Sequence, residues 1–205
     1  MMLNSEEKKL IAKEIEELEQ SSSAELIAVI TQKSSNYKYA SLMVSIFFVF
    51  LISFILFFLK EISTLELLQY QLLIFVGIHL LLKKFNNLIL KIIPQSYKHQ
   101  KASLHAKRQF NNLGISRTKT KQAIMFFVSL DEKYVKILTD SEISKKIPNE
   151  FWQQLVFEFT EDVKREDFVN GYLKALKTSK AILIKHFPIQ GNDENEFSNE
   201  IIELK

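Results

Sequence analysis

Two carboxylates near the middle of the chain, Asp140 and Glu142, have the type and spacing that could hold a metal ion. They follow the apolar run YVKIL (134–138), which is typical of a β-strand, and they would project from the same face if the strand continues that far. Ca²⁺ and Mg²⁺ prefer carboxylate oxygens, and metal-dependent hydrolysis would need such ligands beside an activated water. The pair is therefore our candidate divalent-cation site, against the simpler interpretation of two solvated acids beside a turn.

Other catalytic patterns are missing from the sequence. The chain has no cysteine, which excludes disulfides, thiolate zinc sites and cysteine-dependent phosphatases or proteases. It has four glycines and no GxGxxG, GxxxxGK[ST] or GxSxG pattern, so phosphate-cradling loops are not expected. His99, His105 and His186 lack the spacing of HxxxH or HExxH sites. We therefore assign no catalytic residue from the sequence.

Two apolar runs predict a transmembrane hairpin. Residues 42–59 contain no charge, and about 17–25 such residues span a membrane. The run lacks the polar stripe of a soluble helix. A second uncharged run, 67–82, reaches spanning length with its flanking residues, which gives spans at about 42–59 and 64–83. His79 is an intramembrane polar residue, and its position within a turn of Lys83 favours snorkelling to the interface over a function.

The distribution of lysines predicts the orientation of the hairpin. Lys33 and Lys38 precede the first span, whereas Lys60 is alone in the short loop between the spans. Five lysines follow the second span: Lys83, Lys84, Lys91, Lys98 and Lys101. The positive-inside rule then places both termini in the cytoplasm, on a multi-pass inner-membrane protein. The five lysines are also candidate contacts for anionic lipid head groups. Nucleic acid is not an expected partner, because Tyr97 and Phe110 make no stacking platform.

The segments on either side of the hairpin are expected to form helices around a small sheet. Residues 5–20 have the period of an amphipathic helix, with Ser5 as its expected N-cap and Leu10 on its apolar face. Apolar runs at 26–30, 122–130 and 134–138 predict three strands, the last two joined by a tight turn. Further helices are expected at 85–93 along the membrane surface, at 95–112, from the cap Asn149 to Val163, and from Phe168 to Pro188.

The sheet is thus predicted to be split by the hairpin. Because both termini face the same side, strands before and after the hairpin can meet in one layer, and an insertion in a loop costs little if its ends stay close. The predicted fold class is α/β, a small mixed sheet with packed helices interrupted by a two-helix transmembrane hairpin. We divide the chain into 1–40 (first part of the domain), 41–84 (hairpin), 85–188 (remainder) and 189–205 (tail). Phe197, Ile201 and Ile202 of the tail could dock back onto the domain.

Several segments, taken in order, resemble one known family. They are SSAELIAVITQKSSNYKYA, FNNLGISRTKTKQAIMFFVSLDEKYVKILTDSEISKKIP, Trp152, NGYLKALKTSKAILIKHFP and NDENEFSNEIIEL. Their order and spacing resemble the TPM-domain family, named for its thylakoid-lumen, photosystem-repair and nematode founders. The similarity is to a bacterial membrane-protein branch with two spans inserted in the domain.

The resemblance implies an α/β sandwich. For function it implies acid phosphatase activity and photosystem maintenance, to which plant members are linked, and divalent-metal binding, which some members show. After the third strand the family usually carries glycine near an acid, whereas this chain reads TDSEIS. That departure disfavours an anion or metal site that needs the glycine backbone.

Three functions follow from these observations. The favoured one is a non-catalytic interaction or regulatory module, anchored to the membrane and serving an unknown membrane-protein partner. The first alternative is a metal-dependent (acid) phosphatase that uses Asp140 and Glu142 with Ca²⁺ or Mg²⁺. The second is a small oligomeric transport subunit, suggested by His79 and the hairpin.

Overall fold

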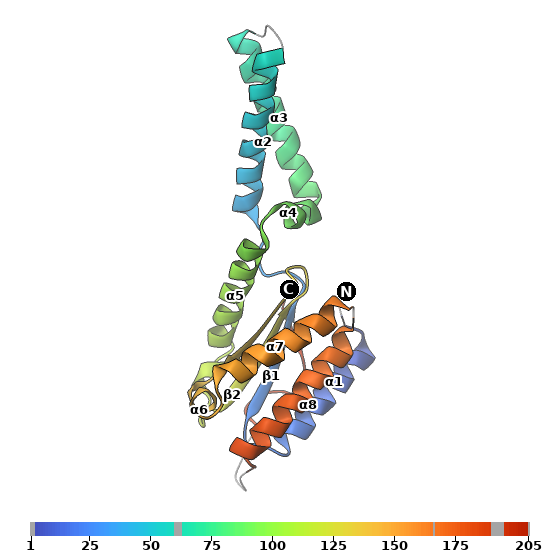
Figure 1. Ribbon diagram of the computed structural model, residues 1–205, viewed down its shortest axis with the longest axis vertical. Coiled ribbons are helices and arrows are strands. Elements are labelled where there is room, and N and C mark those ends of the chain that lie inside the picture. The colour runs from blue at the N-terminus through green and yellow to red at the C-terminus, as the bar shows by residue number, and fades with distance from the viewer. Residues whose placement is uncertain (1–2, 60–62, 166, 190–194, 205) are drawn as a thin grey trace. The chain divides into compact units, whose positions relative to one another are not determined.

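The computed structural model describes residues 3–59, 63–165, 167–189 and 195–204, and divides into two compact units (Figure 1). The α/β unit comprises Met1–Ser34 and His99–Lys205, and the hairpin unit comprises Ser35–Lys98. The described residues form eight α-helices, one 3-10 helix and one four-stranded sheet. Lys60, the basic residue expected in the loop between the spans, lies outside the described residues.

The sheet has the order β3-β2-β1-β4 and mixes parallel and antiparallel pairs. β1 (Glu25–Thr31) runs parallel to β2 (Ala123–Ser129), and β2 runs antiparallel to β3 (Tyr134–Thr139). The fourth strand, β4 (Ile202–Leu204), pairs in parallel with β1 and was not expected from the sequence. The prediction of an α/β fold with a small mixed sheet split by the hairpin segment is confirmed.

Helices cover both faces of this sheet. α1 (Ser5–Glu19), α7 (Asn149–Lys164) and α8 (Phe168–His186) pack on one face (Figure 1), around Phe126 and Tyr172. The other face packs against Ala106 and Phe110 of α5 (Gln95–Asn112) and against Ile115 of the 3-10 helix Ile115–Arg117. Every residue of β1 and β2 is buried as a result, which explains their uninterrupted apolar sequences.

Three local expectations in the α/β unit were wrong. Asn4, not Ser5, caps α1: its side chain accepts a hydrogen bond from the Glu7 N–H at 2.8 Å, and Glu7 accepts one from the Asn4 N–H at 2.7 Å. Leu10 is 53% exposed, because Ile11, Ile15 and Leu18 form the buried face. Asn149 is the first residue of α7, and Pro148 is its N-cap.

The hairpin unit contains α2 (Lys38–Leu59), α3 (Thr64–Lys84) and α4 (Asn86–Ile92). α2 and α3 lie side by side (Figure 1), and Ser63 begins α3 with a capping box to Glu66. α4 packs through Ile89 and Ile93 against Tyr37, which lies before α2. The ring centroids of Tyr37 and Tyr97 are 6.2 Å apart in the same cluster. α4 is therefore held in place inside the hairpin unit.

Candidate functional site

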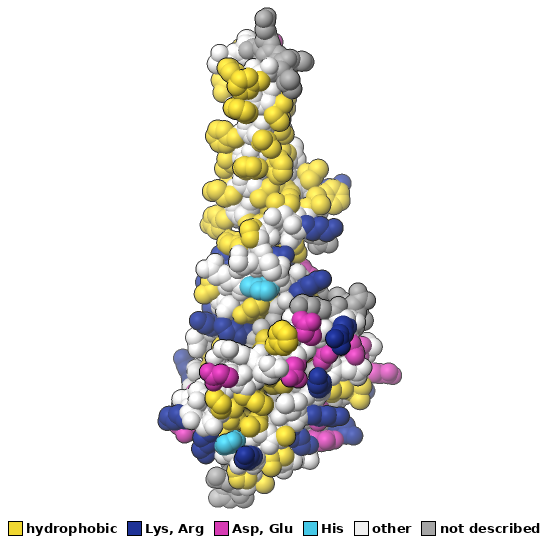
Figure 2. All heavy atoms as spheres, viewed as in Figure 1, with side chains coloured by type: hydrophobic (Ala, Val, Ile, Leu, Met, Phe, Trp, Pro, Cys, Tyr) yellow, Lys and Arg dark blue, Asp and Glu magenta, His cyan; other side chains and the backbone are white. Residues whose placement is uncertain are grey.

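The surface of the hairpin is strongly apolar. Lys38–Phe58 and Thr64–Lys84 are long and apolar enough to cross a membrane, with mean hydropathies of 2.8 and 1.7. Figure 2 shows hydrophobic side chains gathered along α2 and α3. Phe50 and Phe57 of α2 are 71% and 68% exposed, and Leu65 and Leu73 of α3 are each 68% exposed. Such a surface is expected in a lipid environment and not in water.

His79 lies on α3 inside this apolar surface. Its ring stacks on that of Phe75, with centroids 5.9 Å apart and planes 10° from parallel. Its Nδ1 has no hydrogen-bond partner among the described residues. The structure thus gives His79 an aromatic neighbour on α3, and a role for it in transport stays a prediction.

The five lysines that follow the second span differ in their surroundings. Lys83 and Lys84 end α3, and Lys91 is exposed on α4. Lys98 is engaged within the hairpin unit, because its Nζ donates a hydrogen bond to the Leu90 carbonyl at 2.9 Å. Lys101 belongs to the α/β unit. The hairpin unit therefore carries four of the five predicted lipid contacts.

Asp140 and Glu142 do not share a strand face. β3 ends at Thr139, and Asp140 is the N-cap of α6 (Ser141–Lys146), its Oδ1 accepting a hydrogen bond from the Ser141 N–H at 2.7 Å. Glu142 lies in the first turn of α6 and pairs with Lys145 at 2.6 Å. The expectation that the strand continues through both residues is wrong, because the cap turns the chain into a helix. Cation binding by the pair stays a prediction. Within the described ranges, no group of three or more His, Asp or Glu side chains could hold a metal ion.

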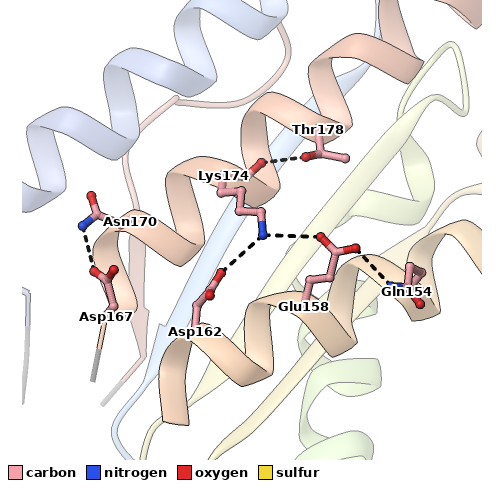
Figure 3. A network of polar contacts seen from close by, with 7 residues as sticks. All are labelled: Gln154, Glu158, Asp162, Asp167, Asn170, Lys174 and Thr178. Atoms are coloured by element: carbon pink, nitrogen blue, oxygen red, sulfur yellow. Dashed lines mark hydrogen bonds and ion pairs between the residues drawn. The ribbon is translucent and has the colours of Figure 1, made fainter. Parts of the chain in front are cut away.

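Asp162, in the last turn of α7, and Asp167, the N-cap of α8, form no possible metal group with Asp140 among the described residues. Between Asn149 and Asp162 the helix rises about 20 Å. Figure 3 shows that Lys174 of α8 lies between Glu158 and Asp162 of α7, at 3.6 and 3.9 Å. Asp167 accepts a hydrogen bond from Asn170 at 2.8 Å. These acids therefore fasten α7 to α8 and shape the turn between them.

A buried carboxylate in the β2–β3 turn was missed by the sequence reasoning. Glu132 is fully buried, and both of its carboxylate oxygens accept a hydrogen bond from the Ser34 N–H at 3.1 Å. The Ser129 hydroxyl donates to the same carboxylate, and the hydroxyl oxygens of Ser34 and Ser129 are 2.6 Å apart. The sequence DEK (131–133) gave only a turn signal, because burial of its acid depends on Ser34, 98 residues earlier.

His105 of α5 lies within electrostatic reach of this carboxylate. Burial lowers the pKa of His105, the charge of Glu132 acts in the opposite direction, and Arg108 lowers that pKa further. The ring packs edge-on against Phe127, with centroids 5.6 Å apart. Its Nε2 lies 3.0 Å from the Gln109 amide nitrogen. His105 is therefore part of the packing between α5 and β2.

A second acidic feature lies where the described tail meets α1 and β1. A cavity of about 350 Å³ is lined by Glu16, Glu19 and Glu25 together with Asn195 and Asn199. Burial raises the pKa of Glu19 to about 8; the N–H of Leu26 opposes this effect, and the charge of Glu25 adds to it. Asn195 donates a hydrogen bond to Glu19, and the backbone N–H of Glu196 donates one to Glu25, each at 3.0 Å. These carboxylates therefore anchor the tail that ends in β4.

Comparisons with known proteins agree with this architecture. Residues 82–182 match the family profile described as the TPM domain. No curated protein matches the chain. The chain is similar to the NMR structure of the BA42 protein from the psychrophilic bacterium Bizionia argentinensis, with a TM-score of 0.61 and 17% identity. That likeness covers 99% of this chain and 96% of the other, and at this identity it shows the fold alone.

Proposed function

We propose, for a chain whose residues 82–182 belong to the TPM-domain family, that the α/β unit is a non-catalytic interaction or regulatory module held at the inner membrane by a two-span hairpin. Membership of the family confirms the resemblance inferred from the sequence, whereas the branch with two inserted spans stays a prediction. The partner in this proposal is a membrane protein, and both termini face the cytoplasm.

The exposed apolar surface of α2 and α3 carries this proposal. At 1.5 Å per residue, α2 is about 33 Å long and α3 about 31 Å, close to the 30 Å hydrocarbon core of a bilayer. Exposed phenylalanines such as Phe47, Phe50 and Phe54 would be unfavourable in water over so large a patch. In lipid the same side chains are in their preferred solvent, and the helices satisfy their own backbone hydrogen bonds.

Both ends of the segment inserted in the α/β unit are fixed to its sheet, which supports an α/β unit that folds around the proposed anchor. Ser34 is the last residue of the α/β unit before the hairpin, and its N–H is held by Glu132. His99 is the first residue after the hairpin, and its ring lies 5.0 Å from that of Tyr134. Both ends of the inserted segment are thus attached to the β2–β3 hairpin of the sheet, so the α/β unit stays intact around the insertion.

The acidic side chains with described partners have structural roles, which fits a non-catalytic module. Asp140 caps α6, Glu142 pairs with Lys145, and Asp162 pairs with Lys174. Asp140 and Glu142 thus act within α6, and Asp162 links α7 to α8.

Carbonate extraction of membranes from cells that express the full chain tests the anchor. The wild-type chain is expected to stay in the pellet. Phe50→Lys/Phe54→Lys is expected to move into the supernatant, because each lysine at the centre of a span costs about 2.5–3.5 kcal/mol. Phe157→Lys, which replaces a 61% exposed phenylalanine of α7, is the matched control and should stay in the pellet. A wild-type chain in the supernatant would contradict the proposal.

Fusions to the C-terminus test the orientation, and native electrophoresis tests the partner. A fluorescent protein at the C-terminus should be bright and alkaline phosphatase there inactive, as expected for a cytoplasmic end. In mild detergent the full chain should migrate as a complex that is larger than the detergent-bound monomer. Migration only as a monomer would contradict the partner.

A further inference from the structure

One surface of the hairpin unit combines exposed apolar side chains with lysines. On α4, Leu88 and Ile92 lie one turn apart and are 37% and 48% exposed. Phe85, just before α4, is 51% exposed, and the Lys84 Nζ lies 5.6 Å from the centre of its ring. Lys91 is exposed next to Ile92. An apolar face bordered by lysines is typical of a helix that lies in a membrane interface.

An adjacent, buried face of α4 fixes its place within the hairpin unit. Ile89 and Ile93 are buried against Tyr37, with Val44 of α2 packed on the same cluster. Lys98 strengthens this attachment through its hydrogen bond to the Leu90 carbonyl. Because α4 is held at the end of α3, its exposed face lies close to the level at which the second apolar helix ends.

The charged residues near α4 in the sequence are of one sign. The sequence contains no Asp or Glu between Leu67 and Asn112. Glu66 lies at the far end of α3, about 27 Å along the helix from Lys84. Among the described residues, no acidic side chain forms an ion pair with Lys83, Lys84 or Lys91. A compact ammonium group with three donors suits the phosphate of an anionic lipid.

We propose that Lys83, Lys84 and Lys91, together with the exposed face of α4, form a binding site for the head groups of anionic phospholipids. Phe85, Leu88 and Ile92 enter the boundary between head groups and acyl chains, and the three lysines contact the lipid phosphates. Lys98 has a different role in this site, because it holds α4 through Leu90. The inference rests on the proposed membrane anchor and adds the class of lipid that surrounds it.

Fluorescence quenching by brominated lipids tests the site in the full chain. Trp152 is the only tryptophan, so Trp152→Phe provides a background without tryptophan, in which Leu88→Trp reports on α4. Ile92→Trp is a second reporter in case the first fails to fold. Phe54→Trp reports on the span. Each variant is reconstituted in phosphatidylcholine vesicles that contain equal fractions of brominated phosphatidylglycerol or brominated phosphatidylcholine.

The expected result is stronger quenching of the Leu88→Trp reporter by phosphatidylglycerol. One basic side chain near an anionic surface strengthens association about fivefold, so the association constant for phosphatidylglycerol should exceed that for phosphatidylcholine by about fivefold or more. Lys83→Gln/Lys84→Gln/Lys91→Gln should bring this ratio close to one. Lys9→Gln/Lys177→Gln/Lys185→Gln removes the same charge from exposed positions of the α/β unit and should leave the ratio unchanged.

The other outcomes separate this inference from the proposed function. Equal quenching of the Leu88→Trp reporter by both lipids, in the chain that keeps Lys83, Lys84 and Lys91, overturns the anionic-lipid site. If the Phe54→Trp reporter is quenched and neither α4 reporter is, the anchor stands and the interfacial site fails. If no reporter is quenched, both the anchor and the site fail.

Discussion

The backbone N–H of Ser34 donates to both carboxylate oxygens of Glu132 at 3.1 Å, across 98 residues of sequence. This contact joins the end of the first α/β segment to the β2–β3 turn. The backbone N–H groups of Leu130 and Asp131 also donate to the carbonyls of Thr31 and Gln32, so the Glu132 contact extends the attachment of this segment to the turn as far as Ser34. The buried carboxylate of Glu132 thus fixes the backbone at the point where the chain leaves the α/β unit for the hairpin.

Glu132→Ala should destabilise the α/β unit by about 2–4 kcal/mol, because the Ser34 N–H and the Ser129 hydroxyl lose their acceptor in a buried place. Glu132→Gln keeps one carbonyl acceptor and should cost less. Urea unfolding of the detergent-solubilised chain, followed by the fluorescence of Trp152 in the core, measures the difference. Glu150→Ala, at an exposed position of α7, is the control. Equal midpoints for Glu132→Ala and this control would refute the structural role of Glu132.

Gly171→Ala should destabilise the packing of α7 on α8. A Cβ at Gly171 would lie 2.7 Å from the Cβ of Asp162 and 3.1 Å from the Phe159 ring, so the two helices would have to separate. Overpacking of this kind costs about 1–3 kcal/mol. Gly77→Ala in α3 meets nothing within 4 Å and should leave the melting temperature unchanged or higher. A Gly171→Ala chain as stable as wild type would show that α7 and α8 separate at no cost.

Glu19 should make the α/β unit less stable as the pH rises. Its pKa in the folded chain is about 8, above the ordinary value of 4.5, so the native state binds the proton more tightly. The contribution is fully present below pH 4.5 and is lost as the pH rises through 8, by up to about 1.4 kcal/mol for each pH unit. Urea unfolding between pH 6.5 and 8 should show this slope in wild type and a flatter one in Glu19→Gln. A slope shared by both chains would assign the pH dependence to another group.

Asp140→Ala should cost about 1 kcal/mol through loss of the N-cap of α6, whereas Asp140→Asn should be nearly neutral, because asparagine also caps. The cation hypothesis makes a separate prediction. Ca²⁺ or Mg²⁺ bound by Asp140 and Glu142 would raise the melting temperature of wild type with concentration. Asp140→Asn/Glu142→Gln would remove that rise while keeping the cap. A rise that persists in this double variant would place the cation elsewhere.

The elements that the sequence predicted well are those with long, local patterns. The helix predicted at 95–112 has the bounds of α5, and the strands predicted at 26–30, 122–130 and 134–138 lie within one residue of β1, β2 and β3. Apolar runs and helical periods of this length depend on burial that the whole element shares. They are therefore visible in one sequence.

The features that it missed depend on partners far away in the chain or on an element too short to show a pattern. β4 has three residues, too few for a pattern, and it exists only because the edge of β1 is available. Glu132 belongs to a polar turn, and its burial depends on Ser34. Asp140 was assigned to a strand because the six-residue helix α6 that it caps is too short to show a helical period. For β4 and Glu132 a contact across the fold decides the role, whereas for Asp140 it is the N–H of the next residue, Ser141.

The parallel register of β1 and β2 has a consequence for the order of events during synthesis. Glu25 pairs with Ala123, so the first strand leaves the ribosome 98 residues before its neighbour exists. At about 5–20 residues per second, this delay is on the order of 5–20 seconds. Both apolar helices are made within that interval. If the hairpin is the membrane anchor proposed above, it would enter the bilayer while β1 is still unpaired, and the sheet would close afterwards on a chain already held by the membrane.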